Sequence, residues 1–189
     1  MEQQGIKGQV ILVDMDYADG IANGFASHIS ERIGRKLPQA DLAEWLVCCA
    51  LDSGMHPEGG VQVLFLHSLH KKRLDSFCPN VFSEIDGKAF RDDRMGEFMM
   101  SCIKDESPEG DVPFVQECLR ALLSDKVVKR LAVVTDDTTC RETLHNVSYD
   151  PQRHVVFQLS MEPATTEGVE SLSLGYSLLH AFGVGADEI

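Results

Sequence analysis

Aspartates follow two apolar runs of the chain, and their spacing could build a metal site. Asp14 and Asp16 come directly after the apolar residues 10–13. Asp136 and Asp137 follow a second apolar run. If both runs are central parallel strands, the four carboxylates meet at one edge of the sheet. Crowded carboxylates repel one another, and a hard cation relieves that repulsion. The sequence therefore predicts a site for Mg²⁺ or Mn²⁺.

The same aspartates have a structural interpretation. Aspartate is common as the residue that caps a helix N-terminus and in turns. Asp19, which stands before Gly20 at the start of a helical pattern, fits that interpretation well. Ligation by Asp14 and Asp137 and simple capping therefore remain alternatives.

A polar and basic segment follows another predicted strand and would lie near the acids. A histidine there could shuttle a proton, and lysines could hold a phosphate group. The alternative is a solvated surface loop. The substrate-binding candidates in this segment are His67, Ser68, His70, Lys71 and Lys72.

The elements that must position these residues alternate along the chain. Continuous β-branched and aliphatic runs predict strands over residues 10–13, 61–66, 130–134 and 154–159, with a short strand or edge segment over 81–85. Helical spacing of apolar residues predicts helices over 21–34, 38–53, 92–104, 112–124, 139–146 and 169–182. This order predicts an α/β fold, a three-layer Rossmann-like domain with a mainly parallel central sheet.

Composition limits the classes of protein. The 189 residues are 43% hydrophobic, which suits a single domain over residues 1–189, with residues 1–8 expected to be flexible. The net charge of −13 argues against a general nucleic-acid coat. No apolar run approaches the length that spans a bilayer, and the N-terminus lacks a signal-peptide pattern. Six cysteines without a C-x-x-C pair are typical of a reduced, cytoplasmic protein.

The order of elements and three acidic positions resemble the PIN/NYN group of Rossmann-like nucleases. That group has an aspartate ending strand one, here Asp14, acids on or after a middle helix, here Glu97 and Asp105, and a Thr/Ser-x-Asp motif ending a late strand. The last motif matches Thr135-Asp136-Asp137.

The resemblance implies a one- or two-metal site that activates water against a phosphodiester, with RNA as the substrate. It assigns the central roles to Asp14 and Asp137, with Thr135 supporting the loop and Glu97 or Asp105 as a third acid. Thr139 stands where the NYN motif usually has another aspartate. An inactive or repurposed member of the group is therefore an alternative.

Asp14-Met15-Asp16 is also similar to the opening motif of HAD-family phosphotransferases. That resemblance implies a phosphatase acting on a small phosphate ester, with Asp14 as nucleophile, Asp16 as general acid/base and Ser68 on the phosphate. A third alternative is a non-enzymatic domain that works through partners or as a homodimer. The apolar segment 172–182 could cover the sheet or meet a second subunit.

Overall fold

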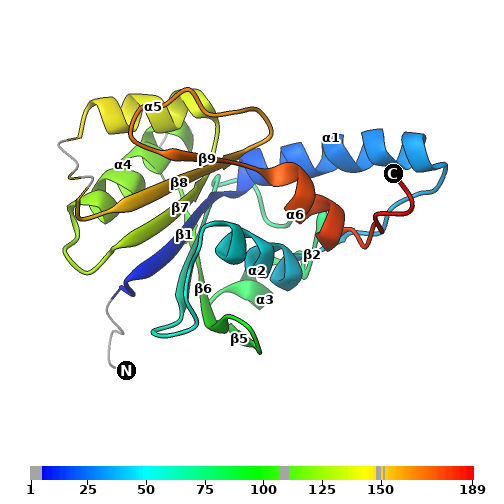
Figure 1. Ribbon diagram of the computed structural model, residues 1–189, viewed down its shortest axis with the longest axis horizontal. Helices are drawn as coiled ribbons and strands as arrows, with labels where there is room; N and C mark the ends of the chain where they lie inside the picture. Colours follow the sequence, from blue (N-terminus) through cyan, green and yellow to red (C-terminus); the bar gives the residue numbers. More distant parts are fainter. Residues whose placement is uncertain (1–5, 107–110, 148–149, 151) are drawn as a thin grey trace.

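A computed structural model describes residues 6–106, 111–147, 150 and 152–189 (Figure 1). The expectation of a flexible start at residues 1–8 falls mostly on residues 1–5, which lie outside the described residues. Residues 6–8 lead directly into the first strand. Among the described residues, no helix is both long enough and apolar enough to cross a membrane.

The centre of the protein is a seven-stranded sheet whose strands are parallel except at one edge. Its order is β5-β6-β3-β1-β7-β8-β9, and only β5 runs antiparallel to its neighbour. A separate two-stranded parallel sheet pairs β2 with β4. The strands are β1 Gln9–Asp14, β2 Ala40–Asp41, β3 Val61–His67, β4 Phe77–Cys78, β5 Ala89–Asp92, β6 Gly96–Lys104, β7 Arg130–Val134, β8 Val155–Ser160 and β9 Glu170–Ser173.

Helices cover both faces of the sheet, as Figure 1 shows. They are α1 Met15–Ile33, α2 Leu42–Asp52, α3 Phe82–Ile85, α4 Asp111–Ser124, α5 Asp137–His145 and α6 Leu174–Ala181. Alternate residues of β1 serve two cores: Ile11 and Val13 pack on the side of α1, α2 and α6, whereas Val10 and Leu12 pack on the side of α4 and α5. The expected α/β class with a mainly parallel sheet between helical layers is confirmed.

The predicted helix over residues 92–104 is wrong, because this segment forms the turn and second strand of a β5–β6 hairpin. Phe98 and Met100 point into one core at the two-residue spacing of a strand. Asp92 Oδ1 accepts the backbone N–H groups of Arg94 and Met95 and so builds the turn. Residues 98–103 are apolar except for Ser101, so this run fits the spacing of a helix as well as that of a strand.

Three other boundaries also differ from the prediction. The short strand or edge segment expected over residues 81–85 is instead the helix α3. Segment 169–182 is divided into β9 and α6, with the Ser173 side chain accepting the Gly175 N–H at the new helix start. Helix α1 begins directly after β1, at Met15, so that Asp16 and Asp19 both lie within it.

Candidate functional site

The candidate site lies where the carboxyl ends of β3, β1 and β7 meet. The chain passes from β1 to β3 and β6 on one side, then crosses to β7 on the other side of β1. Connections therefore leave β1 and β7 in opposite directions, which opens a position for a ligand in sheets of this kind. Helices α1 and α5 begin at this same edge.

Asp14 joins two strand ends and a helix. Its Oδ1 accepts the backbone N–H groups of Asp16 and Tyr17, each at 3.1 Å, and so caps α1. Its Oδ2 accepts the Thr135 hydroxyl at 3.4 Å, across from the end of β7. Asp14 is only 8% exposed and Thr135 is fully buried. The structural and ligating interpretations of Asp14 are therefore compatible, since its position serves both.

Asp16 is held by the segment that follows β3. Its two carboxylate oxygens accept the Ser68 backbone N–H at 2.7 Å and the Ser68 hydroxyl at 3.2 Å. The Lys71 ammonium lies 3.8 Å from Asp16 Oδ1. The sequence analysis expected Asp16 to lie near Ser68 and Lys71 because they follow neighbouring strands. The structure brings these three residues into contact.

Asp19 is a buried anchor that the sequence did not identify. It was interpreted as a cap, but it lies inside α1, is 2% exposed, and accepts the backbone N–H groups of Asp75 and Ser76. Lys71 Nζ is 2.9 Å from its Oδ2. Burial alone would lower the pKa of Lys71, but its hydrogen bond with Asp19 and the nearby carboxylates raise it. The three-residue spacing of Asp16 and Asp19, which places both on one face of a helix, was the available signal.

Asp136 faces the same region from β7. It caps α5, accepting the Thr139 backbone N–H at 2.9 Å and the Thr139 hydroxyl at 2.6 Å. Burial, opposed by a hydrogen bond with the Met161 backbone and reinforced by the charges of Asp136 and Asp14, raises the pKa of Tyr17. The Tyr17 phenol therefore lies in the field of both carboxylates.

Asp137 contacts the loop that contains Thr165 and Thr166. Its oxygens accept the Thr165 backbone N–H and the hydroxyls of Thr165 and Thr166, and Arg141 forms an ion pair with it at 3.0 Å. The Thr165 hydroxyl, opposed by burial and reinforced by the other donors, lowers the pKa of Asp137. These contacts hold a loop onto α5, so Asp136 is the better-placed member of the pair.

The two middle acids lie at opposite ends of β6. Asp105 follows the strand, is 2% exposed, and donates its backbone N–H to the His67 carbonyl at 2.9 Å, which places it at the carboxyl edge. Glu97 stands near the start of β6 and pairs with Lys7 at 3.1 Å. Glu97 is therefore at the wrong end of the sheet to join Asp14.

His67 lines a narrow hollow with Asp14 and Asp16, closed by Leu66, Phe114 and Val115. The hollow is too tight for a water molecule in this conformation. The His67 ring stacks on Phe82 with centroids 3.9 Å apart, and its Nδ1 lies 3.1 Å from the Ser68 carbonyl oxygen. A carbonyl oxygen only accepts hydrogen bonds, so Nδ1 donates in this contact, and Nε2 is the acceptor nitrogen of the neutral ring.

Exposed basic side chains stand beside this edge. His70 and Lys72 are exposed in the turn after β3, next to Lys71.

The donor chemistry suits a hard cation. Within the described residues, no three of the predicted acids bring ligand oxygens within 4.8 Å of one another. Each carboxylate oxygen has two lone pairs, so an oxygen that accepts one N–H can still ligate. Mg²⁺ commonly uses one or two protein carboxylates and keeps several waters. Asp14 and Asp16 fit that pattern, provided that the hollow between them opens.

Comparison with known proteins places the whole chain in one family. No curated protein and no solved structure matches it. A family model described as a family of unknown function (DUF6621) matches residues 3–189. Because this match covers nearly all of the sequence, the chain belongs to the DUF6621 family.

Proposed function

We propose that this protein is a metal-dependent phosphodiesterase that cleaves RNA, with a Rossmann-like fold of PIN/NYN type. The observation that carries the proposal is the position of Asp14, at the crossover point of the sheet and in contact with Thr135 from the adjacent strand. Asp16 lines the same hollow, and Asp136 stands at the next strand end. Carboxylates gathered at this edge are the ligands that Mg²⁺ and Mn²⁺ prefer.

Two further features favour a phosphate substrate. The N-termini of α1 and α5 begin at the edge, and the first turns of helices attract anions. Lys72 and Arg73 supply exposed positive charge beside Lys71, which pairs with Asp16 and Asp19, in a chain of net charge −13. A polyanion would therefore meet positive charge at this edge and be repelled by most of the remaining surface.

The proposed roles follow from the contacts. Asp14 and Asp16 would hold the cation, with Asp136 completing the set through water. A bound cation would lower the pKa of a coordinated water and stabilise charge on the phosphate. Lys71 and Ser68 orient Asp16 through an ion pair and two hydrogen bonds. In its neutral form, His67 would accept a proton from the attacking water at Nε2.

Cleavage of a fluorophore–quencher single-stranded RNA in Mn²⁺ tests the proposal. We expect Asp14→Asn to lower the rate by at least about a hundredfold, because it removes a ligand charge. Asparagine caps helices as well as aspartate does, so folding should be preserved. Asp41→Asn is the matched control, since Asp41 likewise caps a helix, α2, through its side chain. Equal rates for Asp14→Asn and wild type would refute the assignment.

The two rival functions give different results in parallel assays. A HAD-like phosphatase would turn over an aryl phosphate and lose that activity in Asp14→Asn. A non-enzymatic domain would show neither activity, and Asp14→Asn would leave its stability unchanged or slightly raised as carboxylate repulsion falls.

A further inference from the structure

We propose a second metal site, for Zn²⁺ or a similar borderline cation, formed by Glu44, Cys48 and His180 between helices α2 and α6. One ligand atom from each of these three residues lies within 4.8 Å of the others. The site is independent of the proposed nuclease function and uses a different class of ligand.

The two helices position the three donors. Glu44 and Cys48 stand four residues apart on α2 and therefore share one face of that helix. His180 lies in the last turn of α6, which packs directly against α2 (Figure 1). A side-chain hydrogen bond between Cys49 and Ser177 connects the same two helices beside the site. Donors on packed helices keep their spacing better than donors on loops.

The donor set selects the kind of metal. A thiolate with an imidazole and a carboxylate favours Zn²⁺ over Mg²⁺, which binds oxygen ligands. Zinc bonds of about 2.0–2.3 Å place tetrahedral donors ~3.3–3.8 Å apart. His180 Nδ1 is already 3.2 Å from Glu44 Oε1. Three protein ligands leave a fourth position for water, and binding releases the Cys48 thiol proton.

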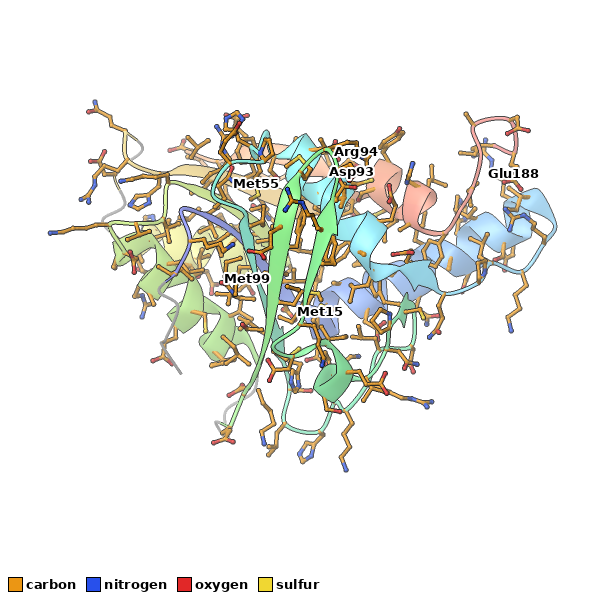
Figure 2. All side chains as sticks on the ribbon, turned by 90° about the horizontal axis from the view of Figure 1, so that it is seen from below. Met15, Met55, Asp93, Arg94, Met99 and Glu188 are labelled. Carbon is orange, nitrogen blue, oxygen red and sulfur yellow. The ribbon has the colours of Figure 1, made fainter. Side chains whose placement is uncertain are left out.

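Arg94 is the competitor for this site. Figure 2 shows Arg94 at the tip of the β5–β6 hairpin, and its guanidinium lies 3.4 Å from Glu44 Oε1. The same guanidinium also contacts Asp92, at 3.2 Å. Arg94 therefore has a second carboxylate and can release Glu44 when a cation binds. Removing its charge should tighten metal binding.

Titration of Co²⁺ into the reduced full chain provides the test. Cobalt substitutes for zinc and gives a thiolate-to-cobalt charge-transfer band only when a cysteine is a ligand. We expect a saturable band that Zn²⁺ abolishes by displacing the cobalt. Cys48→Ser should remove the band, and His180→Ala should weaken binding by at least about tenfold. Arg94→Gln should strengthen binding, because it removes a neighbouring positive charge.

Matched controls make the result decisive. Cys78 is an exposed free cysteine and His28 an exposed histidine, both outside the site. Cys78→Ser and His28→Ala should leave the band and the affinity unchanged. The exposed His180 can be replaced without opening the core, so its variant remains informative if Cys48→Ser misfolds. A wild type without the band, a band that survives Cys48→Ser in folded protein, or an affinity unaffected by His180→Ala would overturn the site. Asp14→Asn should not change it.

Discussion

At the scale of single residues, the aspartates of this protein combine structural and candidate ligand roles. Asp14 caps α1 and still faces the hollow that it shares with Asp16. The sequence correctly placed Asp14, Asp16 and Asp136 at strand or helix ends on one edge. It could not distinguish Asp136 from Asp137, because that choice depends on a loop nearly thirty residues away, which contacts Asp137 through Thr165.

Asp19 provides a stability prediction at the same scale. Its buried carboxylate accepts backbone N–H groups and pairs with Lys71, so Asp19→Asn leaves an ammonium and several donors without their counter-charge. We expect the free energy of unfolding to fall by about 2–4 kcal/mol. Urea denaturation measures this. Asp75→Asn, at the exposed neighbouring position, should change stability by less than about 0.5 kcal/mol. A neutral Asp19→Asn would show that the pair is not a structural anchor.

Asp137 predicts a pH effect. Its folded-state pKa is lowered, chiefly by the Thr165 hydroxyl, so the unfolded chain binds a proton more readily. The resulting stabilisation is present above the ordinary aspartate pKa and is lost as pH falls through the lowered folded value. Asp137→Asn should therefore destabilise the protein at neutral pH and flatten the acid side of its stability profile. Acid profiles of equal steepness for variant and wild type would contradict this.

At the scale of elements, the strands were easier to predict than the hairpin. Residues 10–13, 61–66 and 130–134 are continuous apolar runs, typical of strands buried on both faces, and each lies within an observed central strand. The β5–β6 hairpin was missed because its apolar residues fit two periodicities and its turn depends on Asp92 and Gly96. The order of the strands in the sheet could not be predicted from the spacing of apolar residues either, because it depends on which distant strands pair with one another.

Substitution of Gly96 measures how much the β5–β6 turn contributes to the stability of the protein. Its φ is 77°, and an added Cβ would lie 2.7 Å from the Pro57 carbonyl oxygen. Gly96→Ala should therefore lower stability by about 2–3 kcal/mol. Gly24→Ala is the matched control: a Cβ there meets nothing within 4 Å, and alanine favours α1, so we expect a gain of about 0.5–1 kcal/mol. Thermal denaturation of both variants measures the difference. A neutral Gly96→Ala would mean that the turn relaxes.

At the scale of the whole molecule, one sheet carries both cores. Trp45 is buried on the side of α1, α2 and α6, and Leu119 of α4 is buried on the opposite side. Because the central strands contribute residues to both sides, neither core can persist alone. The single domain expected from length and composition therefore predicts one cooperative unfolding transition.

Leu119→Ala tests that cooperativity. Removing this fully buried side chain should cost about 3 kcal/mol. Tryptophan fluorescence, which reports on Trp45 across the sheet, should show the same shift in midpoint as circular dichroism. An unchanged fluorescence transition beside a shifted circular dichroism transition would indicate two independently unfolding halves.

The central claim is that Asp14 and Asp16 hold a hard divalent cation at the carboxyl edge. Calorimetric titration of Mn²⁺ tests it most directly, performed in a Cys48→Ser background so that the second proposed site does not contribute. We predict saturable binding that Asp14→Asn and Asp16→Asn each abolish and that the cap control Asp41→Asn preserves. Binding that survives both edge variants, or an absence of binding with RNA present, would contradict the account.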